Sequence, residues 1–125
     1  MNMKNLSILL LVMLAFAACK KSSGDSEKPV INVSSPAANQ QFTAGQVIQI
    51  SATVTDNSEL HEVSLEISNK TTGAILIHNH YHVDVMSYNL NETYTAGAGI
   101  TYKMKIEATD HSGNESEVEF EVKGN

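Results

Sequence analysis

The chain is poor in the residue types on which several functional classes depend. It has 125 residues, with a single cysteine, no tryptophan and, among eight basic residues, no arginine. One cysteine cannot form an internal disulfide, so a stable domain must rest on a hydrophobic core, which a chain of this length can supply. The lack of tryptophan removes the best side chain for stacking on a sugar ring or a cation.

The charge balance argues against nucleic acid as a partner. Fourteen Asp and Glu residues oppose the eight lysines, which gives a formal net charge of −6. Proteins that bind nucleic acid present basic patches rich in arginine, and this acidic chain has no arginine. We therefore expect no nucleic-acid partner.

The one long apolar run extends from Leu6 to Ala18 and ends at Cys19. Lys4 precedes the run, and small residues stand directly before the cysteine. A bilayer-spanning helix needs ~20 apolar residues, which this run does not reach. A basic start, a short apolar middle and small residues at the cut are the layout of a secretory signal. We predict that residues 1–18 are a cleaved signal peptide.

The segment Ala17-Ala18-Cys19 resembles the lipobox of bacterial lipoproteins, although Phe16 stands where that family usually has leucine. The resemblance implies cleavage before Cys19, lipid on its sulfur and acylation of the new N-terminus. The membrane is then a partner through the lipid anchor, and the location is the bacterial cell envelope, at the outer membrane, facing either the periplasm or the exterior. Ordinary secretion with a free thiol is the alternative.

Residues 20–28 are small, polar and charged, so the lipidated cysteine and this segment (19–28) should form a flexible tether. From Pro29 onward apolar and polar residues alternate, which is the pattern of half-buried strands. The alternation predicts strands at residues 30–33, 46–55, 61–69, 74–85, 87–90, 101–109 and 117–123. Seven short strands joined by turns favour an all-β, two-sheet sandwich.

Three segments resemble parts of known sandwich domains. Tyr102, two residues before the inward position of Met104, resembles the tyrosine corner of immunoglobulin-like domains. Residues 108–114 resemble the last hairpin of bacterial immunoglobulin-like and cadherin-like modules, and residues 42–48 resemble their early strand. The whole chain resembles an uncharacterised family of short Bacteroidota lipoproteins. These resemblances imply an immunoglobulin-like β-sandwich over residues 29–125 and no particular activity.

Three histidines alternate along the strand predicted at 74–85. His78, His80 and His82 share their phase with Asp84, and the opposite phase is apolar, so all four should point away from the core. Imidazole is the commonest protein ligand of zinc and copper. Neighbouring histidines on one face stand ~6.6 Å apart, whereas His78 and His82 stand ~13 Å apart, too far to share an ion without distortion. His80, His82 and Asp84 therefore form one candidate metal set.

A second candidate set adds Glu62 to His78 and His80. If the hairpin folds about Thr71, Glu62 lies opposite His80 and Ser64 lies opposite His78. A register slip of one residue would turn Glu62 to the other face. The alternative to both sets is an edge strand whose exposed polar side chains discourage aggregation, or a surface that gains charge in acid.

The two remaining histidines have weaker patterns. His61 shares its phase with Val63 and Leu65 at the start of a predicted strand, so we expect it to pack half-buried. His111 lies in a predicted turn, where we expect it to be solvated.

Two predicted loops at one end of the sandwich carry oxygen ligands that suit calcium. These are Asp56, Asn57, Glu59, Asp110 and Asn114. Cadherin-like modules use loop acids in this way, which makes calcium a further candidate ion. Asp and Asn also occupy turns to bond their own backbone, and the cadherin ligand motifs are not reproduced here.

The expected function is a non-catalytic binding module anchored in the envelope. The sequence has no Gly-x-Ser-x-Gly elbow and no phosphate-binding glycine loop, and its cysteine is assigned to lipid. The partner would be an envelope protein or an extracellular ligand. The alternative is a lipoprotein that binds zinc or copper through His78 and His80.

Overall fold

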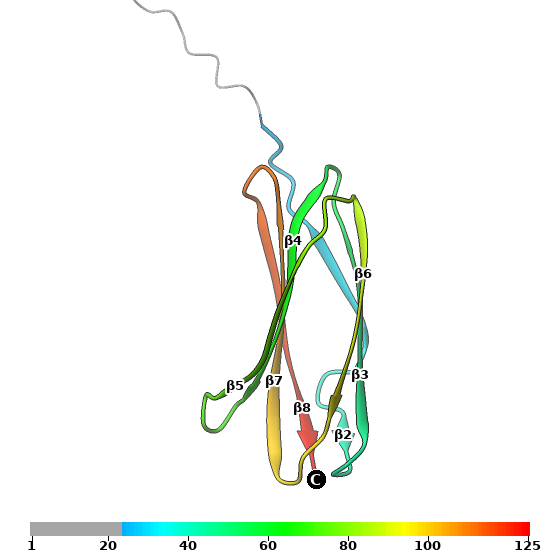
Figure 1. Cartoon of the computed structure of the whole chain (residues 1–125), viewed down its shortest axis with the longest axis vertical. Coiled ribbons are helices and arrows are strands. Elements are labelled where there is room, and N and C mark those ends of the chain that lie inside the picture. The colour runs from blue at the N-terminus through cyan, green and yellow to red at the C-terminus, as the bar shows by residue number, and fades with distance from the viewer. Residues whose placement is uncertain (1–23) are drawn as a thin grey trace, which may run out of the picture.

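Two β-sheets pack face to face in the structure, a computed structural model that describes residues 24–125 (Figure 1). The predicted signal peptide (1–18) and Cys19 lie outside the described residues. Within residues 24–125 every regular element is a strand, so the expected all-β class is confirmed. This part of the chain contains no helix that is long and apolar enough to cross a membrane.

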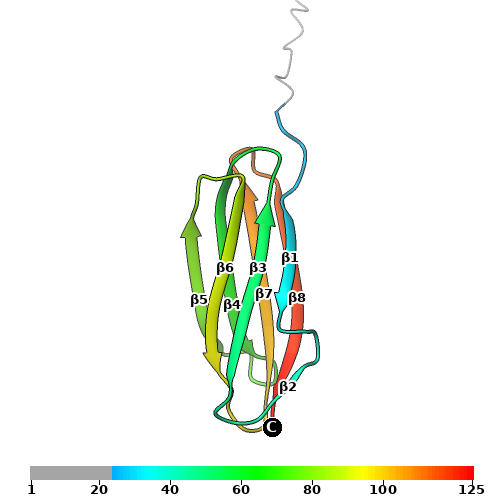
Figure 2. The ribbon, with the colours of Figure 1, turned by 90° about the vertical axis from the view of Figure 1, so that its right-hand side faces the viewer.

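Eight strands form the described part of the two sheets. They are β1 (Val30–Ser35), β2 (Gln41–Phe42), β3 (Val47–Thr55), β4 (Leu60–Asn69), β5 (Ile75–His82), β6 (Ser87–Thr95), β7 (Ile100–Asp110) and β8 (Glu115–Gly124). The smaller sheet has the order β1-β3-β6 and lies in front of the larger sheet, β2-β8-β7-β4-β5, in Figure 2.

The predicted strands are all present, with three differences beyond shifts of one or two residues at strand ends. The sequence missed β2, because two residues are too short to show alternation, and it ended β6 at Leu90 although the strand continues to Thr95. The strand predicted at 74–85 is too long, because β5 ends at His82. Strand β5 lies at the edge of the larger sheet, as expected.

Strand β3 shows how alternation produces the core. Every second side chain of β3 is buried between the sheets, namely Ile48, Ile50, Ala52 and Val54, while the alternate residues face outward. Burying one such aliphatic side chain contributes about 1.5–3 kcal/mol. The opposing side of the core comes from β4 and β7, whose buried residues include Leu65 and Ile106.

The predicted tyrosine corner is present. Tyr102 on β7 is 1% exposed, and its hydroxyl accepts a 2.7 Å hydrogen bond from the backbone N–H of Gly97. The ring of Tyr94 on β6 packs edge-on against it, with 5.4 Å between the ring centroids. The corner therefore fixes the connection between β6 and β7, which belong to different sheets.

Edge strands β5 and β6 are joined by a side-chain contact between the two sheets. The hydroxyl of Tyr81 on β5 donates a hydrogen bond to the carboxylate of Glu92 on β6. Burial raises the pKa of Tyr81 to about 12, and the hydrogen bond to Glu92 acts in the same direction. Both causes favour the neutral phenol, because ionisation would place a second negative charge beside the carboxylate.

The chain enters the sandwich at the end formed by the β3–β4 loop, the β5–β6 connection and the β7–β8 turn, which we call the entry end (Figure 1). Asp25 is held there: its carboxylate accepts hydrogen bonds from Asn57 Nδ2 and Ser58 Oγ, and its carbonyl accepts one from Asn114 Nδ2. The segment predicted as a flexible tether thus contacts the domain from Asp25 onward. The C-terminus lies at the opposite end.

Candidate functional site

The histidines of β5 lie on the outer face of the larger sheet. His78, His80 and His82 are all exposed, as their phase predicted. The rings of His78 and His80 are neighbours, with 4.3 Å between centroids and a tilt of 47°. Three imidazoles therefore line an open sheet edge.

The predicted register of the β4–β5 hairpin is wrong by two residues. Glu62 pairs with His82 and Ser64 pairs with His80, whereas the sequence placed Glu62 opposite His80. The pairing shifts between Ile67 and Ser68, where β5 carries one extra residue next to the turn. This bulge accounts for one residue of the difference, and the turn accounts for the other, because it pairs Ser68 with Ile75 where the predicted register pairs Ser68 with Ala74. Glu62 stays on its predicted face because a shift of two residues preserves the alternation.

Glu62 connects a different pair of histidines from the one expected. Its Oε1 lies 2.9 Å from His80 Nδ1, and its Oε2 lies 3.6 Å from His82 Nε2. The hydrogen bond with His80 lowers the pKa of Glu62, and the nearby His82 adds to this effect. The set of Glu62, His78 and His80 is therefore corrected to one in which Glu62 reaches His80 and His82.

Asp84 does not join His80 and His82, so the first candidate set is not formed. Strand β5 ends at His82, and Asp84 has a φ of 38°, in the left-handed region. Alternation no longer governs its direction there. Its carboxylate instead accepts a hydrogen bond from Nε2 of His111 at 2.8 Å.

His61 is exposed, which overturns its expected half-buried packing. The pairing of β4 with β7 shifts between Leu60 and Glu62, so His61 is the additional residue of a β-bulge. Leu60 and Val63 are both fully buried on either side of it. A bulge turns one side chain out of phase, and no local sequence signal marks this one.

His111 is exposed, as expected for its turn, but it has partners. Besides its bond to Asp84, its ring lies 4.8 Å from the ring of His61. His61, Asp84 and His111 each offer a ligand atom, and these three atoms lie within 4.8 Å of one another. Sequence reasoning did not group them, because they come from three separate parts of the chain: the start of β4, the β5–β6 connection and the β7–β8 turn.

The calcium candidates are brought together in part, with one addition. Carboxylate oxygens of Asp56 and Asp110 lie within 4.8 Å of each other and of Asp25, which the sequence had assigned to the tether. Asn57 and Asn114 bond Asp25, while Glu59 is not in this group. Oδ2 of Asp56 is buried and has no hydrogen-bond partner among the described residues.

Asp110 also has a structural role in its turn. The side chain is buried and accepts hydrogen bonds from Ser112 N, Asn114 N and Asn114 Nδ2, at 2.7–2.9 Å. Burial by itself would raise the pKa of Asp110, but the hydrogen bonds from Asn114 and Ser112 outweigh it and lower the pKa. The ionised carboxylate therefore organises the β7–β8 turn.

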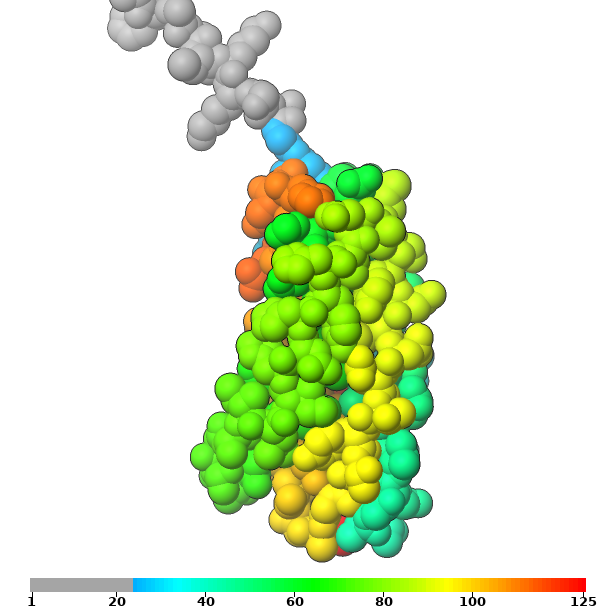
Figure 3. Space-filling model, in the orientation of Figure 1, coloured from blue at the N-terminus to red at the C-terminus, as the bar shows by residue number. Residues whose placement is uncertain are grey.

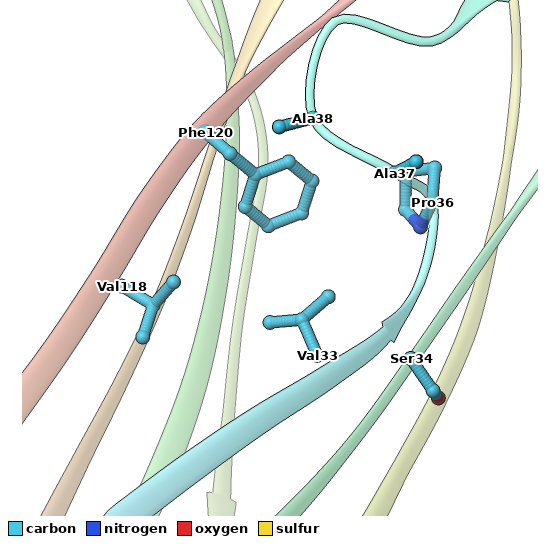
Figure 4. Close-up of a pocket in the computed structure, with 7 residues that line it drawn as sticks. All are labelled: Val33, Ser34, Pro36, Ala37, Ala38, Val118 and Phe120. Atoms are coloured by element: carbon cyan, nitrogen blue, oxygen red, sulfur yellow. The ribbon is translucent and has the colours of Figure 1, made fainter.

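A hollow of about 380 Å³ lies between the end of β1 and the face of β8 (Figure 4). Its lining consists of Val33, Ser34, Pro36, Ala37, Ala38, Val118 and Phe120. None of these side chains is titratable, and the hydroxyl of Ser34 is bonded to the carbonyl of Ser51. The lining therefore provides no general acid or base.

The two sheets are antiparallel except for the short parallel pair of β2 and β8. Together with the tyrosine corner and the loops gathered at the sandwich ends, they define an immunoglobulin-like β-sandwich. Residues 29–98, more than half of the chain, match the bacterial Ig domain family. The chain belongs to this family, whose domains are of a non-catalytic type. The family also suggests an extracellular or envelope-associated protein.

Solved structures show the same kind of fold at low identity. Two structures of a superoxide reductase (neelaredoxin) from Ignicoccus hospitalis are 12% and 13% identical, with TM-scores of 0.54 and 0.51. The matches cover 80% and 77% of this chain, and 83% and 80% of the other chains. A fibronectin(III)-like module of Clostridium thermocellum CbhA is 24% identical with a TM-score of 0.49, covering 76% of this chain and 96% of the module. No curated protein matches the chain.

Proposed function

We propose that the protein is an envelope-anchored lipoprotein whose Ig-like sandwich is a non-catalytic binding module for an envelope protein or an extracellular ligand. The observation that supports it best is membership of the bacterial Ig domain family, in a chain with a leader that ends in Ala17-Ala18-Cys19. Lipid on Cys19 would hold the domain at the outer membrane.

The contact between Asp25 and the domain limits the distance between the domain and a lipid on Cys19. Six residues lead from Cys19 to Asp25, and an extended chain of that length spans about 20 Å. A lipidated Cys19 would therefore keep the entry end close to the membrane. The sheet faces and the opposite end would be the surfaces open to a partner.

The anchor is tested by comparing the native protein with Cys19→Ser in intact envelopes. The native protein should fractionate with membranes, and its intact mass should correspond to cleavage before Cys19 plus acyl chains. Cys19→Ser should lose the acyl mass and leave the membrane fraction, while the neighbouring Ser23→Ala should behave as the native protein does. A native product with an uncut methionine start, or without acyl chains, contradicts the proposal.

The binding role is tested by cross-linking in intact envelopes. The native protein should capture a defined partner, and the double variant H78A/H80A should capture the same partner. The metal-binding alternative predicts instead that the native protein takes up zinc or copper and that H78A/H80A does not. Absence of any partner at native expression levels contradicts a binding module.

A second candidate function is metal binding on β5, favoured by the position of Glu62 between His80 and His82. One carboxylate and two imidazoles are ligands that suit zinc or copper. Because a ligand that binds the folded state stabilises it, zinc should raise the melting temperature. The variant H80A/H82A should shift less than the native protein, and no shift at millimolar zinc excludes the site.

A further inference from the structure

Three segments that are distant in sequence meet at the entry end. His61 stands at the start of β4, Asp84 in the β5–β6 connection and His111 in the β7–β8 turn. The green, yellow-green and orange segments that contain them lie side by side at the upper end of Figure 3. The three ligand atoms lie within 4.8 Å of one another, and all three residues are exposed. An ion in solution therefore has direct access to them.

The backbone holds two of these three side chains in an unusual position. The bulge turns His61 outward, between the buried Leu60 and Val63. Asp84 has a positive φ, and its segment is attached to β4 by hydrogen bonds from Leu60 N to Val85 O and from Val83 N to His61 O. Bulges and strained residues are concentrated at functional sites, where they aim side chains.

The turn that carries His111 is equally well fixed. Asp110 accepts hydrogen bonds from Ser112 N and Asn114 N, and it is 3% exposed. The first residue after this buried anchor is His111. The cluster thus rests on organised backbone and not on long, free side chains.

The geometry is close to that of a zinc site. Zinc–nitrogen and zinc–oxygen distances near 2.0–2.1 Å place tetrahedral ligands about 3.3 Å apart. In the structure Nε2 of His111 is 2.8 Å from Oδ1 of Asp84, and the His61 ligand atom completes the group within 4.8 Å. Small side-chain rotations would bring the three atoms to a common ion, which would take the place of the proton between His111 and Asp84.

The charges around the cluster favour a cation. In the described part of the chain, Asp84 and Glu62 form ion pairs with histidines and with no lysine. His82 stands next to the cluster, with its ring 5.4 Å from the ring of His61. A further imidazole is therefore at hand for a fourth ligand position.

We propose that His61, Asp84 and His111 form a zinc-binding site at the entry end of the sandwich, with the fourth position taken by water or by His82. This site shares no ligand with the set of Glu62, His80 and His82 unless His82 turns toward it. It depends on neither the lipid anchor nor a protein partner.

The test is calorimetric titration of the full chain, purified in detergent, with zinc chloride, together with cobalt(II) absorption as a probe of coordination geometry. The native protein should bind zinc and give the intense visible bands of tetrahedral cobalt. H61A/H111A removes two ligands, so its zinc affinity should fall by at least 10–100-fold. In known metal sites, loss of a single residue that only supports a ligand already lowers affinity by this much. Asp84→Asn, which suits the same backbone conformation, should weaken binding as well.

H78A is the matched control, because it removes an exposed histidine of the same face that belongs neither to this cluster nor to the set of Glu62, His80 and His82. It should keep zinc affinity and the cobalt bands, and the melting temperatures of all variants in EDTA report whether they are folded. The proposal is overturned if H61A/H111A binds zinc as the native protein does, if H78A loses binding instead, or if the native protein binds no zinc at millimolar concentration. A failed anchor or a missing partner would leave these results unchanged.

Discussion

The hydroxyl of Tyr102 accepts a hydrogen bond from the backbone N–H of Gly97 at 2.7 Å, and this bond links β7 to the connection that leaves the other sheet. The contact is tight, because a Cβ on Gly97 would lie 3.2 Å from the tyrosine oxygen and 3.1 Å from Cδ1 of Ile100. The corner therefore depends on both residues.

Tyr102→Phe should lower the free energy of unfolding by about 1–2 kcal/mol, since it leaves the Gly97 N–H without its partner. Urea unfolding monitored by circular dichroism measures the change. Tyr94→Phe is the control, because it keeps the edge-on ring and should change stability by less than about 0.5 kcal/mol. If Tyr102→Phe and the native protein are equally stable, the hydrogen bond of the corner does not contribute to stability.

Glu62→Gln should make the free energy of unfolding less dependent on pH in the acid range. The hydrogen bond with His80 lowers the pKa of Glu62 in the folded state, so its contribution is present at neutral pH and is lost as the pH falls through the lowered pKa. Between pH 6 and pH 3 the native protein should lose more stability than Glu62→Gln. Glu66→Gln, two positions along the same face, is the control, and parallel profiles for Glu62→Gln and the native protein would contradict the prediction.

Asp110→Asn should destabilise the fold by about 2–3 kcal/mol, because a buried carboxylate that accepts three hydrogen bonds is replaced by a group that also presents donors. Thermal and urea unfolding at pH 7 give the size of the effect. Glu115→Gln, an exposed change in the same hairpin, should be nearly neutral. A similarly small effect of Asp110→Asn would show that the turn forms without its anchor.

Tyr81→Phe should make the protein less sensitive to alkali. Because the pKa of Tyr81 is raised to about 12, its contribution is present below its ordinary pKa of 10 and is lost as the pH rises through about 12. The free energy of unfolding of the native protein should therefore fall more steeply between pH 9 and pH 12. In Glu92→Gln, where burial remains but the carboxylate is gone, the fall should be intermediate; identical slopes in all three proteins would argue against the contact.

Calcium should raise the melting temperature if the acidic group at the entry end binds it. Asp25, Asp56 and Asp110 supply the oxygens, and Oδ2 of Asp56 is buried without a partner among residues 24–125. Differential scanning fluorimetry in calcium, magnesium and EGTA should show a calcium-specific rise that Asp56→Asn reduces. Identical melting temperatures in calcium and EGTA would leave these acids with a structural role in the turns.

Much of the candidate site could be predicted from the sequence, but the contacts between its residues could not. The phase of β5 correctly predicted that His78, His80 and His82 are exposed, and the turn acids were expected at one end. The bulge at His61 and the positive φ of Asp84 were not predicted, because they arise from pairing with β7 and from the attachment of residues 83–86 to β4. Those interactions link residues that are distant in sequence.

The sequence by itself determined most of the strands and their inward faces, because alternation and turn residues are local properties of the chain, while the resemblance of Tyr102 to immunoglobulin-like domains supplied the tyrosine corner. The tertiary structure decided which residues stand beside each other. Alternation has a period of two, so it identifies the face of Glu62 but cannot distinguish His80 from His82 as its opposite residue. Asp25 likewise joined the acidic group only through folding, since its contacts Asn57 and Asn114 come from two loops that the sandwich brings together.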